Sequence, residues 1–193
     1  MGGPVVTTLT EVLLVALILG GIAVYLSSMA GRLDRLHHRI ETTHAGLDAQ
    51  LLRRVAAAQD LAASGLLDPA SSLLMSASAQ EALTADPDDD TARLLAESEL
   101  TRTLGAVFGS PEDVDAVLEA AGSGDAVAEQ MIGELAVACR RVELARRFHN
   151  DVVRSCLQLR RKRVVRTFRL AGYTELPATA DFDDTVPRGL AGR

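Results

Sequence analysis

The sequence predicts an all-α protein in which an N-terminal transmembrane helix is followed by an antiparallel helical bundle with two long helices. Three observations lead to this prediction. Residues 12–30 contain no charged side chain. Aromatic residues make up only 3% of the 193-residue chain and Trp is absent, whereas Ala, Leu and Arg, which favour helices, are abundant. Two long stretches repeat apolar residues every three or four positions, which is the spacing of a buried helix face.

The uncharged run at residues 12–30 is long enough to cross a bilayer, because about 19 residues rising 1.5 Å each approach the roughly 30 Å of hydrocarbon. Before it, the only charged side chain is Glu11. After it come three arginines: Arg32, Arg35 and Arg39. The positive-inside rule therefore predicts a single-pass protein of the cell membrane, with residues 1–11 outside and residues 31–171 forming a cytoplasmic bundle.

A cleaved signal peptide is the alternative, because small residues precede Gly31 where a signal peptidase would cut. Against it, the run has no basic segment before it and exceeds the usual apolar core of about 7–15 residues. Cys139 and Cys156 lie 17 residues apart in one predicted helix, about 25 Å along its axis and too far for a disulfide bond. Two unpaired thiols suit a reducing compartment.

The first amphipathic helix is predicted from Leu33 to about Ser64. Its apolar positions recur at helical spacing: Leu33, Leu36, Ile40, Leu47, Leu51, Val55, Ala58 and Leu61. Shorter helices are predicted at about 69–83, 90–108 and 111–121. Each has an Asp or Ser at its start, and two of them have Pro at the first helical position, which is a favoured beginning.

The second long helix is predicted from Asp125 to about Leu170, roughly 45 residues. Its apolar seam follows a 4,3 alternation typical of a coiled coil: Met131, Leu135, Ala138, Val142, Ala145, His149, Val152, Cys156 and Leu159. Residues 172–193 are predicted to be an extended or partly disordered tail, with Phe182 docked on the bundle and the last few residues disordered. Antiparallel pairing of the two long helices would return the C-terminal end of the second to the bilayer.

A basic segment occupies that C-terminal end. It consists of six cationic residues: Arg160, Arg161, Lys162, Arg163, Arg166 and Arg169. Anionic lipid, nucleic acid and the acidic segment 86–134 are its three conceivable partners. A position beside the membrane favours lipid, since each Lys or Arg there contributes about 1 kcal/mol. Nucleic acid is disfavoured because Phe168 is the only aromatic residue for stacking and the net charge is −6.

Two groups of residues resemble metal sites. His37, Glu41 and His44 share one helix face, but the Glu-x-x-His pattern of di-iron bundles needs a second copy, and the sequence has none. Asp86, Asp88, Asp90 and Glu97 occupy EF-hand positions 1, 3, 5 and 12, but position 6 is Thr91 instead of Gly. A solvated helix face and an acidic helix start explain the two groups better. The prediction is therefore no bound metal or other cofactor.

No catalytic residue is predicted. His149 lies in the apolar seam without an identifiable acid or nucleophile, and Cys139 and Cys156 are typical of small core residues. The sequence contains no phosphate-binding loop, nucleophile elbow or paired zinc motif. We therefore expect that the protein is not an enzyme.

Three segments carry a recognisable pattern. One is LDRLHHRIETTHAGLDAQLLRR at residues 33–54, with the core LDAQLLRR; another is ESELTRTLGAVF at 97–108; the most specific is ELAVACRRVELARRFHNDVVRSCLQLRR at 134–161. The third contains a signature of six residues: Ala145, Arg146, Phe148, His149, Asn150 and Asp151. With these segments the chain resembles the LemA family of bacterial membrane-anchored helical proteins, over nearly its whole length.

The resemblance implies an antiparallel bundle with an outward-facing N-terminus, and it implies no reaction. Two stretches depart from the family pattern. VAAAQDLAAS replaces the Pro-containing stretch that usually follows the paired arginines, and RKRVVRTF replaces the Phe-Pro-Asn that usually ends the last helix.

The function expected from these observations is that of a membrane-anchored scaffold or adaptor whose cytoplasmic bundle binds other, unidentified proteins, without nucleic acid. The alternative is a small-ligand or metal-binding enzyme built in the bundle core. Ala16 and Gly20 form a small-xxx-small pair that would allow two copies to associate within the membrane.

Overall fold

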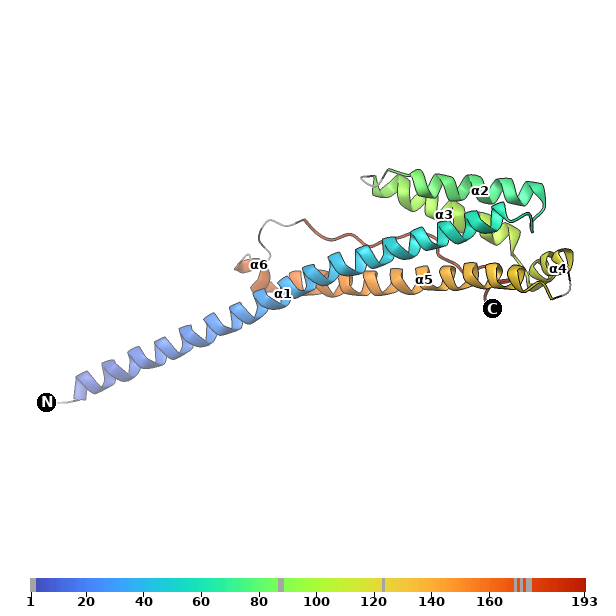
Figure 1. Cartoon of the computed structure of the whole chain (residues 1–193). Helices are drawn as coiled ribbons and strands as arrows, with labels where there is room; N and C mark the ends of the chain where they lie inside the picture. Colours follow the sequence, from blue (N-terminus) through green and yellow to red (C-terminus); the bar gives the residue numbers. More distant parts are fainter. Residues whose placement is uncertain (1–2, 87–88, 123, 169, 171, 173–174) are drawn as a thin grey trace. The chain divides into compact units, whose positions relative to one another are not determined.

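The computed structural model describes residues 3–86, 89–122, 124–168, 170, 172 and 175–193, with side chains described from residue 9 onward. These residues form helices and no strand, which confirms the predicted all-α class (Figure 1). The helices are α1 (Gly3–Ala63), α2 (Pro69–Thr84), α3 (Asp90–Val107), α4 (Pro111–Ala121), α5 (Ala126–Arg160) and α6 (Arg163–Thr167).

The chain divides into two compact units. Unit 1 comprises Met1–Glu41 and Val152–Ala178, and unit 2 comprises Thr42–Asp151 and Thr179–Arg193. Helices α1 and α5 each contribute residues to both units.

The N-terminal part of α1 exposes its apolar side chains. Large apolar residues from Leu9 to Tyr25 are exposed, and only 6% of the most apolar 18-residue window of this helix is buried. Among the described residues, α1 is the one helix long and apolar enough to cross a membrane. This exposure distinguishes the N-terminal part of α1 from a helix of a soluble core, which would be mostly buried.

Unit 1 is held by a small apolar cluster. Met29 and Leu33 of α1 pack with Cys156 and Leu159 of α5, and Val165 of α6 completes the cluster. Along this stretch the two long helices run antiparallel, because the earlier α1 residues meet the later α5 residues.

The second long helix ends earlier than predicted. It stops at Arg160 instead of near Leu170, and Lys162 adopts an extended backbone conformation (φ −62°, ψ 134°) before α6 begins. This break allows Val165, which is buried, to pack on the cluster of Cys156 and Leu159. Burying the Val165 side chain contributes more free energy than continuing the helix would, because β-branched residues have only a weak preference for helix.

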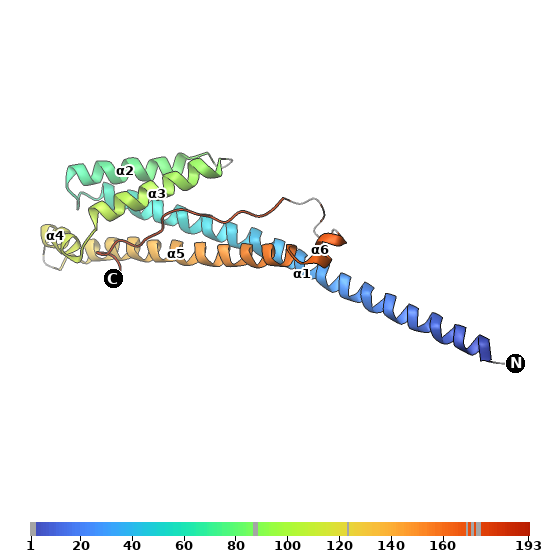
Figure 2. The same ribbon diagram turned by 180° about the vertical axis from the view of Figure 1, so that it is seen from behind.

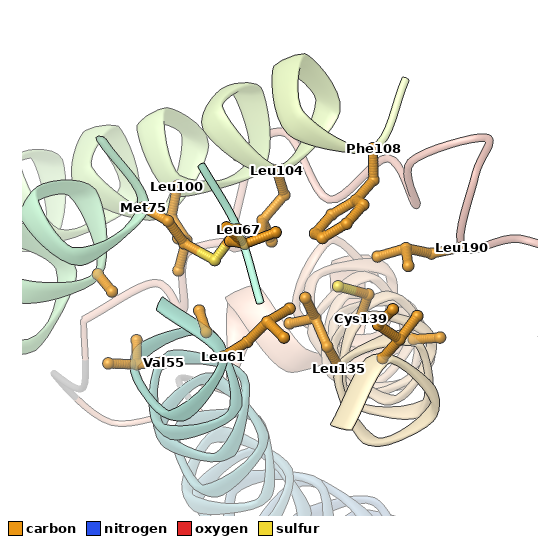
Figure 3. Close-up of a cluster of buried hydrophobic side chains, with 14 of the residues drawn as sticks. Val55, Leu61, Leu67, Met75, Leu100, Leu104, Phe108, Leu135, Cys139 and Leu190 are labelled. Carbon is orange, nitrogen blue, oxygen red and sulfur yellow. The ribbon is translucent and has the colours of Figure 1, made fainter. Parts of the chain in front are cut away.

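Unit 2 contains the main core. Its buried residues come from α1 to α5 and the C-terminal segment, as Figure 3 shows for Leu61, Met75, Leu100, Leu135 and Leu190. Helices α2 and α3 lie side by side (Figures 1 and 2). The predicted apolar positions of α1 from Leu47 to Leu61 are buried, which confirms the helix face inferred from their spacing.

The short helices begin where their capping residues predict. The Asp68 carboxylate accepts hydrogen bonds from the backbone N–H groups of Ala70 and Ser71, at 2.9 and 3.1 Å. Ser110 and Asp113 form a reciprocal capping box at the start of α4. Helix α3 is capped by Asp89, one residue before its first helical position. These caps satisfy N–H groups that have no partner inside the helix.

Residues 179–193 form a C-terminal strap that packs on unit 2. The Asn150 side chain donates to the Ala180 carbonyl at 3.0 Å and accepts from the Ala180 N–H at 2.9 Å. The Arg146 guanidinium binds both carboxylate oxygens of Asp184, at 2.6 and 2.8 Å. Disorder was expected for the last few residues, yet Leu190 is fully buried in the main core.

The strap approaches the α3–α4 connection closely at Gly189. Its N–H donates to the Phe108 carbonyl at 3.1 Å. A side chain at this position would collide with the backbone carbonyl oxygens of Ser110 and Phe108. Glycine is therefore required sterically for the end of the chain to reach the core.

Candidate functional site in unit 1

The two units carry opposite charge. The sequence places ten Arg or Lys residues and four Asp or Glu residues in unit 1, giving a formal charge of +6. Unit 2 has ten basic and 22 acidic residues, a formal charge of −12. The modest net charge of −6 thus conceals a basic unit that contains the apolar helix and an acidic unit that contains the main core.

Most of the predicted basic segment is exposed on unit 1. Arg161, Lys162, Arg163 and Arg166 are exposed, and within the described part of the chain none of them forms an ion pair. Arg160 is half-buried and donates from Nη1 to the Glu175 carbonyl at 2.7 Å. Arg169 lies outside the described residues.

Apolar side chains accompany these cations. Phe168 is 54% exposed and Leu176 is 67% exposed. Leu176 also lines a hollow of about 520 Å³, together with Leu157, Val165, Arg160, Arg161, Arg166 and Gly172. Exposed apolar groups between cations are typical of protein surfaces that lie at the interface of a membrane with anionic headgroups.

Several arginines of unit 2 form ion pairs within that unit. Arg54, Arg93, Arg102 and Arg146 each contact a carboxylate within the unit. The four exposed cations of the basic segment have no such internal counter-ion among the described residues. Their charge must therefore be balanced by solution ions or by an anionic partner.

The weak metal candidates on α1 have separate partners. His37 Nδ1 lies 3.0 Å from the Leu33 carbonyl, which makes that nitrogen the donor. Glu41 lies 3.6 Å from His38 at an exposed position. His44 lies 3.1 Å from Asp48. In the part of the chain that the structure describes, no group of three or more His, Cys, Asp or Glu residues could hold a metal ion.

The EF-hand-like residues are also distributed among other interactions. Asp88 lies outside the described residues. Asp90 is the first residue of α3 and lies 3.5 Å from Arg93. Glu97 is buried and forms an ion pair with Arg54. A calcium loop needs its twelfth residue free to bind the ion with both oxygens, so the arrangement of Glu97 contradicts this assignment.

The seam histidine and the two cysteines occupy core positions. His149 is buried, with Nδ1 at 3.3 Å from the Thr43 hydroxyl and its ring edge against His44. Cys139 and Cys156 are buried free thiols, and burial raises the pKa of each. A thiol with a raised pKa is a poor nucleophile at neutral pH, because the thiolate is the reactive form.

The buried ion pair of Arg54 and Glu97 was missed in the sequence. Besides the carboxylate, Arg54 binds the Thr101 hydroxyl at 2.9 Å and the Glu97 carbonyl at 3.1 Å. A signal existed, because Arg54 follows Leu51 by three positions and precedes Ala58 by four, which places it on the apolar stripe. A charged residue on such a stripe indicates a buried partner.

We compared the chain with protein-family models, with proteins of curated function and with solved structures, and none of the three comparisons gave a match.

Proposed function

We propose that this chain is a single-pass membrane protein of the LemA type, with its N-terminus outside, residues 12–30 across the membrane, and the rest of unit 1 and all of unit 2 on the cytoplasmic side. Unit 1 holds the protein against the anionic inner leaflet, and unit 2 acts as a non-enzymatic scaffold for protein partners. The segregation of charge is the observation that carries the proposal: the acidic residues collect in unit 2, so the unit that contains the exposed apolar helix has a formal charge of +6.

The direction of this segregation agrees with membrane electrostatics. An anionic leaflet attracts the unit of charge +6 and repels the unit of charge −12. At about 1 kcal/mol each, five or six cations would give a total attraction to the leaflet several times larger than the thermal energy. The positive-inside rule gives the same orientation from Arg32, Arg35 and Arg39.

Lipid contact by the basic segment can be measured with a tryptophan reporter, because the chain contains no Trp. In full-length protein reconstituted in nanodiscs with about 30% phosphatidylglycerol, we expect brominated lipids to quench Phe168→Trp fluorescence. Charge reversal of Arg161, Arg163 and Arg166 to Glu should abolish most of the quenching, since it replaces attraction with repulsion.

The control reporter is Leu73→Trp on the acidic unit 2, at a position that is 71% exposed. We expect it to remain unquenched in the same nanodiscs. Equal quenching of Phe168→Trp with and without the three charge reversals would show that the basic segment does not bind the lipid surface.

The scaffold role and the orientation can be tested together in intact cells. A photocrosslinking amino acid at Leu73 is expected to form adducts with cytoplasmic proteins, because the proposal places unit 2 in the cytoplasm with its partners. The high exposure of Leu73 means that this replacement leaves the core unchanged. Adducts with extracytoplasmic proteins, or a mature N-terminus at Gly31, would contradict the proposed topology.

A further inference from the structure

A second basic feature of unit 1 lies beside the basic segment. It is a hollow of about 470 Å³ between α1 and the end of α5. Four cations line it: Arg32, Arg35, Arg39 and Lys162. Ser155 and Gln158 add neutral polar groups, and no carboxylate is among the lining residues. We refer to this feature as the Arg32–Lys162 pocket.

The arrangement of the cations follows from the helix geometry. Arg32, Arg35 and Arg39 are spaced by three and four residues, which places them along one face of α1. Lys162 is 123 positions beyond Arg39 in the sequence and reaches the pocket because α5 ends just before it. Among the described residues, neither Arg32, Arg35 nor Lys162 forms an ion pair or a side-chain hydrogen bond.

A hollow in unit 2 has a different balance of charges and serves as a comparison. It has a volume of about 590 Å³ and also contains three arginines: Arg53, Arg141 and Arg193. Asp60 and Glu134 line the same hollow and balance two of those charges. The Arg32–Lys162 pocket has four formal positive charges and no negative charge among its lining residues, so it favours an anion with more than one charge.

The position of the pocket points to a lipid headgroup. Arg32 follows the end of the uncharged run by two residues, and Arg39 is about 10 Å further along the helix. The Arg35 guanidinium lies back along α1, with Nη1 3.7 Å from where a side-chain carbon on Gly31 would be. Leu36 and Leu159 line the same pocket and offer apolar contact. With α1 across the membrane as proposed above, these cations lie at the depth of the lipid phosphates, just beyond the hydrocarbon layer.

We propose that the Arg32–Lys162 pocket binds one phospholipid whose headgroup carries two phosphates, as in cardiolipin. Guanidinium groups bind phosphate oxygens through paired N–H donors, and four cations can serve two phosphates at once. Two linked phosphates lose less freedom on binding than two separate phosphatidylglycerol molecules. This inference rests on the proposed position of unit 1 at the membrane surface.

The test uses full-length protein in a nonionic detergent and native mass spectrometry to count retained lipids. Cardiolipin is compared with twice its concentration of phosphatidylglycerol, so that the phosphodiester chemistry and the total charge are the same. We expect one cardiolipin to be retained per chain, with an apparent affinity at least about tenfold above that of phosphatidylglycerol. Equal retention of the two lipids would overturn the proposal.

Substitution of the pocket provides the second arm. Arg35→Gln with Lys162→Gln should weaken cardiolipin retention by about 10- to 30-fold, because two charges near the phosphates are lost. The matched control, Arg53→Gln with Arg141→Gln, removes the same charge from the unit 2 hollow and should change nothing. Unchanged retention in the first variant would overturn the proposal. Circular dichroism checks folding, and Arg32→Gln, an exposed single change, gives an independent variant.

Inorganic diphosphate distinguishes a lipid from a soluble ligand with the same phosphate chemistry. At millimolar concentration it should leave the bound cardiolipin in place, since it cannot contact Leu36, Leu159 or the apolar helix. Complete displacement would assign the pocket to a soluble ligand and overturn the lipid assignment. A negative result in any of these lipid-retention experiments would not change the expected quenching of Phe168→Trp. The pocket and the proposed function are therefore tested separately.

Discussion

Replacing Glu97 with Ala is expected to lower the free energy of unfolding by about 3–5 kcal/mol, because it leaves the Arg54 guanidinium charged and buried without its carboxylate. The side chains of Arg54 and Glu97 are only 2% and 4% exposed. The Thr101 hydroxyl and the Glu97 carbonyl would remain as partners of Arg54, but neither supplies a compensating charge. Denaturant unfolding of the full-length protein in mild detergent, followed by circular dichroism, measures the loss.

Two comparisons separate this effect from a general sensitivity of α3. Glu99→Ala removes the exposed pair of Glu99 and Arg102 on the same helix and should cost about 1 kcal/mol or less. The double variant Arg54→Met with Glu97→Leu replaces the pair by apolar side chains and should recover much of the stability. A Glu97→Ala variant as stable as Glu99→Ala would mean that the buried pair contributes little.

The parts of the fold that were predicted correctly depend on local sequence. The Asp68 and Ser110 caps and the apolar faces of α1 and α5 are set by residues within one or two helical turns. The break at Lys162 depends instead on burial of Val165 against Cys156 and Leu159, a tertiary contact that no local pattern contains. A helical propensity of a few tenths of a kcal/mol per residue does not decide such a position.

The candidate site was likewise predicted where the pattern is local in sequence and missed where it depends on tertiary contacts. The basic segment was visible in the sequence because its cations are consecutive or nearly so. Antiparallel pairing of the two long helices predicted that the basic segment would lie near Arg32, Arg35 and Arg39. The Arg32–Lys162 pocket itself was not predicted, because it depends on the end of α5 just before Lys162. The weak metal candidates His37, Glu41 and His44 share one helix face in the sequence, but in the structure each of these side chains has a different neighbour.

The structure also suggests what two signature residues of the LemA resemblance do in this chain. Arg146 binds the Asp184 carboxylate, and this hydrogen bond raises the pKa of Arg146. Asn150 binds the N–H and the carbonyl of Ala180. Both residues therefore hold the C-terminal strap, which is a structural task and requires no reaction. The Asn150 amide therefore gives the backbone N–H and carbonyl of Ala180 the hydrogen bonds that a neighbouring β-strand would otherwise provide.

The end of the C-terminal strap is expected to contribute strongly to the stability of unit 2. Leu190→Ala is expected to lower the free energy of unfolding by about 2–5 kcal/mol, because Leu190 has no exposed surface and packs in the main core (Figure 3). Phe108 and Cys139 belong to the same cluster and would border the resulting cavity. Removing a buried side chain loses its transfer free energy and leaves space that neighbours fill only in part.

The matched control is Leu73→Ala, which removes the same atoms from an exposed position of α2 and should change stability by about 0.5 kcal/mol or less. Unfolding of both variants is compared with wild type in the same detergent. A Leu190→Ala protein as stable as Leu73→Ala would mean that the last residues do not pack on unit 2. The expected loss of stability follows from the burial of Leu190 in the main core. Gly189 and the strap hydrogen bonds hold the end of the chain there.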